Sequence, residues 1–256
     1  WNQQVSSYVN FYENLLQKGK KFYDNKNLVK NYDQNRFQGR GGGYLSNKEV
    51  SSLIGTFSFK NHKIADFGTG TGRVVIELLR KNILKIFAVD SSRHMLNMLK
   101  KRTRVSKGKL KLVHSGVNDL KMKKNSVDIV TALRLFEHLP QSDKQNFFTK
   151  AQKILISGGK LSFSFLNKNS LENMLLSYRK SKSPVYPDRL EEVIALLKKE
   201  GFEIEEVKYD FIVPRVIFKR AISLLLSFFM VLEDLAIKTP LKKYASHITI
   251  IAKTKT

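Results

Sequence analysis

The chain has 256 residues, which suits one α/β domain with a substantial core. It contains no cysteine, which excludes a disulfide framework, a cysteine–zinc site and catalysis by a thiolate nucleophile. Its 46 lysines and arginines outnumber 22 aspartates and glutamates, and the resulting formal charge of +24 would draw the protein toward RNA or an anionic membrane face.

The N-terminal region, residues 1–60, is predicted to form a helical cap and a loop. Apolar residues within 5–31 recur at helical spacing, whereas the glycines of 39–43 indicate a flexible loop before a helix over 47–56. Tyr32 and Arg36 would close over a ligand, although a plain glycine linker between two helices explains the same residues. No apolar secretory segment is visible, so we expect a cytoplasmic location; because the chain begins with Trp1, upstream residues are an open question.

Residues 64–72, IADFGTGTG, predict a strand, a glycine turn and the start of a helix. The turn contains Gly68, Gly70 and Gly72, which lack a Cβ and so allow a ligand to lie against the backbone. A second apolar run, 86–89, ends in Asp90, whose carboxylate can accept hydrogen bonds from both hydroxyls of a ribose. Ser91 follows it and opens the next helix.

The two turns together resemble the class I S-adenosylmethionine-dependent methyltransferases. The pattern D-x-G-x-G-x-G is matched from Asp66 to Gly72, and D-x-S-x-x-M-L is matched from Asp90 through Leu96. The resemblance covers roughly residues 30–210 and implies S-adenosyl-L-methionine as cofactor. It implies that the first turn holds the methionine part, Asp90 the ribose and Met95 the adenine. The predicted cofactor-binding residues are Asp66, Gly68, Thr69, Gly70, Gly72, Asp90, Ser91, Met95, Asn118, Asp119 and Arg134.

One position departs from the family pattern. The acidic residue usually found after the third strand, facing the adenine amine, is replaced by Gly116. Asn118 or Asp119 is the candidate substitute. Arg134 would face either the cofactor carboxylate or an anionic acceptor, or would be a surface cation.

Strands and amphipathic helices alternate from residue 63 onward, which predicts a doubly wound, Rossmann-like sheet. The cofactor-binding core spans 61–167 and the C-terminal part spans 168–256, in a single domain. A helix over 188–200 ends before Gly201, and by resemblance the last two strands pair antiparallel in a seven-stranded sheet. The expected strands are 63–67, 84–89, 110–114, 127–131, 160–165, 202–209 and 246–252.

The last two strands are separated by an insertion, residues 211–245, that contains an apolar helix over 221–232. Twelve residues are too few to span a bilayer, which needs ~20. Arg215, Lys219 and Arg220 lie at one end, which suits a segment on anionic lipid or a lid over an apolar pocket. Packing on the sheet, or a dimer interface, explains the same composition.

Methyl transfer from a sulfonium needs alignment in a dry site and no obligatory metal. His138, just past the fourth strand, is the candidate general base, ahead of Glu137 and Tyr32. It would otherwise only order the turn before Pro140. The Asn/Asp-Pro-Pro-Tyr sequence of enzymes that methylate exocyclic or amide nitrogens is not present after the fourth strand.

Three functions are consistent with these sequence features. The first is methyl transfer to a small apolar acceptor of isoprenoid, quinone-like or lipid-linked chemistry. The second is an RNA methyltransferase that uses the positive charge to grip phosphates. The third is a cofactor-binding or membrane-associated scaffold without transferase activity.

Overall fold

A computed structural model describes residues 29–55, 57–103, 108–176, 185–221 and 223–255; the side chains of 34–36, 176, 223 and 224 lie outside this description. One seven-stranded sheet has the order β3-β2-β1-β4-β5-β7-β6. All neighbours are parallel except β7, which runs antiparallel to β5 and β6. The strands are β1 (Lys63–Phe67), β2 (Lys85–Asp90), β3 (Leu110–His114), β4 (Val127–Ala132), β5 (Leu155–Leu166), β6 (Phe202–Asp210) and β7 (His247–Thr254).

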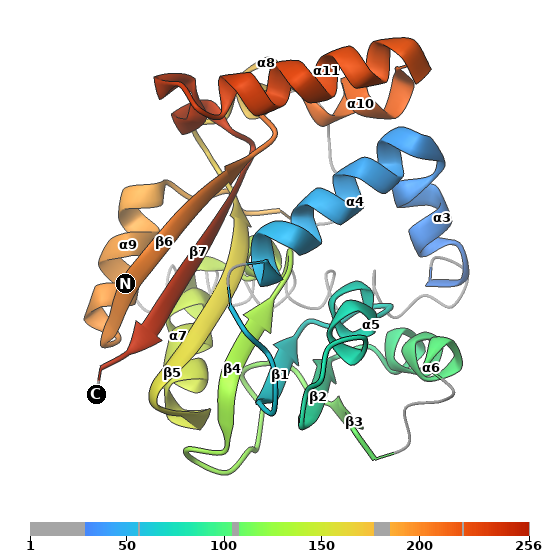
Figure 1. The fold of residues 1–256 in the computed structure, drawn as a ribbon. Coiled ribbons are helices and arrows are strands. Elements are labelled where there is room, and N and C mark those ends of the chain that lie inside the picture. Colours follow the sequence, from blue (N-terminus) through green and yellow to red (C-terminus); the bar gives the residue numbers. More distant parts are fainter. Residues whose placement is uncertain (1–28, 56, 104–107, 177–184, 222, 256) are drawn as a thin grey trace, which may run out of the picture.

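The fold is therefore the predicted Rossmann-like sheet, with flanking helices in two layers (Figure 1). Leu53, Val75 and Leu99 of three helices pack into one cluster on one face, and Phe147 and Leu197 belong to a second cluster on the other face. The first face carries α4 (Gly39–Ile54), α5 (Arg73–Leu79) and α6 (Arg93–Arg102), and the second carries α7 (Gln141–Ile154) and α9 (Leu190–Lys199).

The strand order reverses at β1, which lies between β2 and β4. Ligands of such sheets bind at this point, outside the carboxyl ends of the strands. A short 3-10 helix, η1 (Phe136–His138), follows β4 at the same edge. The topology alone therefore brings the loops after β1, β2 and β4 around one site.

The glycines of 39–43 do not form the predicted loop. They lie in the first turns of α4, directly after α3 (Tyr32–Phe37). A Cβ on Gly41 would lie 1.8 Å from the Phe218 carbonyl oxygen, and one on Gly42 would lie 2.4 Å from the Phe37 carbonyl carbon. The glycines thus permit close packing between backbones, and their low helix propensity is overridden by that contact. Most of the helix predicted over 5–31 lies outside the described residues.

The insertion between β6 and β7 forms a helical layer at the carboxyl end of the sheet (Figure 1, orange-red). It consists of α10 (Arg215–Arg220), α11 (Ser223–Ala236) and η2 (Pro240–Tyr244). Phe211, Phe218 and Leu226 join Leu45 of α4 in a third apolar cluster. Another short helix, α8 (Leu171–Leu176), follows β5. Within the described ranges, no helix is both long enough and apolar enough to cross a bilayer.

Candidate active site

The turn after β1 has the backbone of a ligand cradle. Gly68, Gly70 and Gly72 have φ values of 63°, 56° and 91°, in the left-handed region that side chains rarely adopt. A Cβ on Gly72 would lie 2.3 Å from Leu99 Cδ1, so that glycine serves packing against α6. A Cβ on Gly70 would meet only the Gly68 carbonyl oxygen at 4.0 Å, so its side faces open space. A cofactor lying against the turn would fill that space.

Asp90 is held at the end of β2 by backbone amides of both turns. Gly70 N donates to Asp90 Oδ2 at 2.7 Å, and Ser92 N donates to Oδ1 at 2.8 Å. Ser92 also caps α6, because its Oγ accepts a hydrogen bond from Met95 N at 3.2 Å. A carboxylate fixed in this way can also accept hydrogen bonds from two vicinal hydroxyls, as a ribose requires.

Asp66 is the buried carboxylate of the site. Burial raises its pKa to about 6, against the hydrogen bond that Thr131 Oγ1 donates to its Oδ1 at 2.7 Å. Neighbouring Asp90 raises the pKa further, in the direction expected for two carboxylates that share a site. Asp66 is thus a carboxylate whose charge a cationic sulfonium or ammonium would favour.

The wall after β3 contains the position where the sequence departs from the family pattern. A Cβ on Gly116 would lie 3.4 Å from Asp119 Oδ2, so the Asp119 carboxylate occupies the space beside this glycine. Asn118 Oδ1 instead accepts a hydrogen bond from Asn146 Nδ2 at 3.0 Å. Both residues line the cavity, and the geometry favours Asp119 as the substitute acid.

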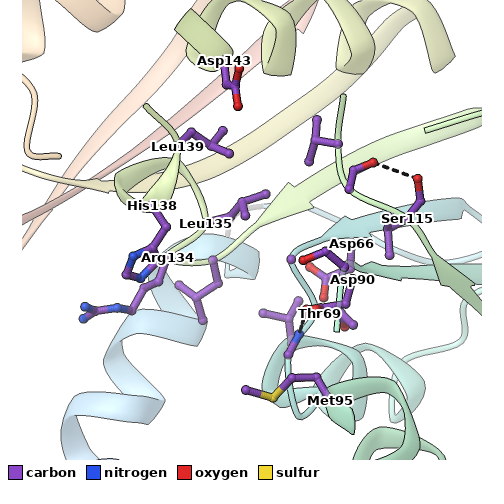
Figure 2. A pocket seen from close by; sticks show the side chains of 18 of the residues that line it. Asp66, Thr69, Asp90, Met95, Ser115, Arg134, Leu135, His138, Leu139 and Asp143 are labelled. Atoms are coloured by element: carbon purple, nitrogen blue, oxygen red, sulfur yellow. Dashed lines mark hydrogen bonds between the residues drawn. The ribbon is translucent and has the colours of Figure 1, made fainter. Parts of the chain in front are cut away.

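These loops enclose a cavity of about 290 Å³. His138, Arg134 and Leu135 face it from the β4 side, and Asp90 and Met95 face it from the opposite side (Figure 2). The structure brings to its lining every residue of the predicted site except Gly72: Asp66, Gly68, Thr69, Gly70, Asp90, Ser91, Met95, Asn118, Asp119, Arg134 and His138. Tyr32 lines it as well, whereas Glu137 of η1 is fully buried outside the lining and the side chain of Arg36 is outside the described part.

Arg134 is not a surface cation, because its guanidinium is largely buried and paired with two carboxylates of the protein. Its Nη1 donates to Glu49 Oε1 at 3.0 Å, and its Nη2 lies 2.9 Å from Glu137 Oε1. Burial alone would lower the pKa of Arg134, but the two carboxylates raise it, so the guanidinium stays charged. The backbone of Arg134 has φ 57°, and its N–H donates to Ser164 Oγ at 2.9 Å. These contacts of its backbone and side chain hold the loop after β4 in place.

The buried charges continue from Arg134 toward the insertion. Glu49 also accepts a hydrogen bond from Arg73 Nη1 at 2.9 Å. On the far side, His247 Nε2 lies 2.9 Å from Arg134 Nη1 and 3.2 Å from Arg215 Nη1. Both guanidiniums can only donate, so Nε2 of a neutral His247 accepts. Arg215 in turn pairs with Glu172 of α8 at 3.0 Å.

Sequence reasoning missed Glu49, Asp33 and Tyr186. Glu49 was missed because its partners Arg73 and Arg134 lie 24 and 85 residues away in the sequence. Asp33 accepts a hydrogen bond from Thr71 Oγ1 at 2.8 Å and pairs with Arg102, which joins α3 to the glycine turn. Tyr186 lines the cavity in an irregular segment that has no motif of its own.

A sheet that reverses at β1, a glycine cradle and a carboxylate at the end of β2 define the class I S-adenosylmethionine-dependent methyltransferase fold and site. Comparison with known proteins agrees. Residues 64–159 match the family model described as a methyltransferase domain. The family model and the relatives therefore support a class I S-adenosylmethionine-dependent methyltransferase, with S-adenosyl-L-methionine as its cofactor.

Three similar proteins illustrate the range of the family. A ubiquinone/menaquinone biosynthesis C-methyltransferase of Campylobacter jejuni is 29% identical over 63% of this chain and 79% of its own. A carboxy-S-adenosyl-L-methionine synthase of Campylobacter lari is 22% identical over 64% of this chain and 80% of its own. The magnesium protoporphyrin IX methyltransferase of Synechocystis, solved with bound S-adenosylhomocysteine, aligns with a TM-score of 0.59, 14% identity and 84% coverage of both chains.

Proposed function

We propose that the protein transfers the methyl group of S-adenosyl-L-methionine to a small, apolar acceptor of quinone-like, isoprenoid or lipid-linked chemistry. The observation that carries the proposal is the wall opposite Asp90 and Met95. There Leu135, Leu139 and Pro140 provide an apolar surface beside the imidazole of His138. An aromatic acceptor with one ionisable hydroxyl matches that surface. The C. jejuni relative, which works in quinone biosynthesis, supports the same substrate class.

The residues present fit the cofactor. Asp90 would accept hydrogen bonds from the ribose, Met95 would pack on the adenine, and Asp119 would accept a hydrogen bond from the adenine amine. Gly70 leaves room for the ligand to approach the backbone, and Asp66 supplies negative charge near the methionine end. When bound, S-adenosyl-L-methionine supplies an already activated methyl group on a sulfonium.

His138 would serve as general base for an acceptor hydroxyl or carbon acid. It lies on the cavity wall, and Figure 2 shows its side chain on the same side as Arg134, away from the Asp90 carboxylate. Removing the acceptor proton as the nucleophile forms is worth about 10²–10⁴ in rate. His138→Ala should therefore slow transfer by about that factor, while cofactor affinity stays unchanged.

The RNA methyltransferase remains the second candidate because the chain carries a formal charge of +24. The scaffold is the third. For the location, we propose the cytoplasm, with the acceptor met at a membrane surface.

The first test is calorimetric titration with S-adenosyl-L-methionine and S-adenosylhomocysteine. Asp90→Asn should weaken both, whereas Glu203→Gln, on the exposed part of β6, is the matched control and should weaken neither. The second test follows methyl transfer from labelled cofactor to a panel of catechols, quinols and prenylated phenols, with total RNA in parallel. Label in RNA but not in the phenols would favour the RNA methyltransferase. Cofactor binding without methyl transfer to any acceptor would favour the non-catalytic scaffold.

A further inference from the structure

One face of α11 is apolar and exposed. Five large apolar side chains on it have exposed fractions between 41% and 61%. They recur at spacings of three and four residues, which places them along one side of the helix. They are Leu225, Phe228, Val231, Leu232 and Leu235.

The opposite face of α11 already has its partners. Leu226 is buried in the third apolar cluster, against which Phe229 and Met230 pack. Glu233 is fully buried, and its carboxylate accepts hydrogen bonds from the backbone amides of 211–213 at 2.7–3.1 Å. The helix is thus fixed in orientation, so its apolar outer face is a built feature and not the side of a loose segment.

Basic residues flank α11 at both of its ends. Residues 214–245 contain six lysines and arginines and two acids. Both acids are engaged: Glu233 holds the 211–213 backbone, and Asp234 pairs with Lys48 at 2.8 Å. Lys219 and Arg220 lie exposed before α11, and Lys238, Lys242 and Lys243 lie exposed after it.

We propose that the outer face of α11 docks onto an anionic lipid bilayer. A helix of 14 residues is about 21 Å long, too short to span a bilayer but suited to lie in the interface with its apolar face in the acyl boundary. The flanking lysines and arginines then meet lipid phosphates.

Charge favours a bilayer over a second copy of the chain. A two-fold contact through α11 would place the basic ends of two helices, each on a molecule of formal charge +24, against one another. An anionic surface instead satisfies both the apolar face and its basic rim. A bilayer is also where the enzyme would meet an apolar acceptor. Only this link to the acceptor rests on the proposed function; the binding of α11 to lipid does not.

Vesicle co-sedimentation of the whole protein, without acceptor, tests the inference. We expect binding to vesicles of phosphatidylcholine with phosphatidylglycerol, and much weaker binding to phosphatidylcholine alone or at high salt. The double variant Phe228→Ser/Leu232→Ser should lower the partition coefficient by about tenfold or more. Leu84→Ser, which changes an equally exposed leucine before β2, is the matched control and should bind as the parent does.

Thermal unfolding and cofactor titration accompany the assay, because neither Phe228 nor Leu232 lines the cavity and both readouts should stay unchanged. Equal binding of parent and double variant, or no binding to anionic vesicles, would overturn the inference. A parent that is dimeric in sedimentation velocity, made monomeric by the double variant and indifferent to vesicles, would assign the face to a second copy. Failure of cofactor binding would contradict the proposed function while vesicle binding stands.

Discussion

Gly70, in the glycine turn after β1, combines a φ of 56°, an N–H that donates to Asp90 Oδ2 and open space on the side where a Cβ would lie. Gly70→Ala should cost about 1 kcal/mol of folding free energy and should also place a methyl group where we propose that the cofactor lies. Gly201→Ala is the matched control, since Gly201 has φ 82° and open space around it but lies after α9. Urea unfolding should show similar losses for both variants, and calorimetry should show weakened cofactor binding for Gly70→Ala alone. Equal affinities would remove the turn from the site.

Asp210, at the end of β6, gives a pH-dependent prediction. Burial raises its pKa to about 6, so the native state holds the proton more tightly than the unfolded chain does. The stability contributed by protonated Asp210 is complete below about pH 4 and is lost as pH rises toward 6. Asp210→Asn should therefore stabilise the protein at pH 7.5 by about 2 kcal/mol and change little at pH 4. Urea unfolding at both values checks this, and a gain of the same size at both would contradict it.

At the scale of elements, the contact between α4 and α10 depends on a glycine inside a helix. Gly41→Ala should destabilise the protein by about 2 kcal/mol or more, because its Cβ would overlap the Phe218 carbonyl. Gly43→Ala, two positions along the same helix, has nothing within 4 Å and should gain about 0.5–1 kcal/mol from helix propensity. Opposite signs in chemical unfolding are expected, and a gain from both variants would refute the close packing.

Another pair ties an irregular segment to α7. Lys144 Nζ donates to Asp188 Oδ1 at 2.6 Å and to the Tyr186 carbonyl at 3.1 Å, with the lysine side chain 1% exposed. Lys144→Met should cost about 3 kcal/mol, because it leaves the Asp188 carboxylate buried without its partner. The double variant Lys144→Met/Asp188→Leu should recover most of this loss. Unfolding of the parent, the single variants Lys144→Met and Asp188→Leu, and the double variant forms the double-mutant cycle, and additive losses would contradict the pairing.

The seven strands were predictable from their alternating or continuous apolar runs, and most boundaries agree within two residues. The main exception is β5, which begins at Leu155, five residues early, and includes Gly158 and Gly159. Local rules failed where tertiary contacts decide. The glycines of α4 were assigned to a loop because propensity cannot represent a carbonyl from α10, 177 residues away. The two motifs predicted the part of the cavity lining that follows β1 and β2, but Tyr186 lines the cavity only through the packing of 185–188, and Asp33 contacts Thr71 only through the packing of α3.

Across the whole molecule, a chain of buried charges connects the cofactor cavity to the helical layer. It runs from Arg73 through Glu49 and Arg134 to His247, and then through Arg215 to Glu172. Each link is short and mostly shielded from water, where electrostatic interactions are stronger than at a surface. The loop after β4, the start of β7 and α8 are consequently held in one arrangement around the site.

The formal charge of +24 also predicts how the protein treats RNA. If the charge acts only through phosphates, binding to unrelated single-stranded RNAs should be sequence-independent and should fall at least tenfold between low and physiological salt. Fluorescence anisotropy across a salt series measures the slope. Tight binding to one RNA that persists at high salt would favour the RNA methyltransferase.

The register of β6 and β7 places the two ends of the helical insertion next to each other. Asp210, the last residue of β6, pairs directly with His247, the first residue of β7, so the insertion leaves and returns at adjacent points. An insertion of this kind can be gained, exchanged or shortened in evolution without altering any strand pairing of the sheet. Relatives that keep this sheet can therefore diverge in what they approach while conserving how they hold the methyl donor.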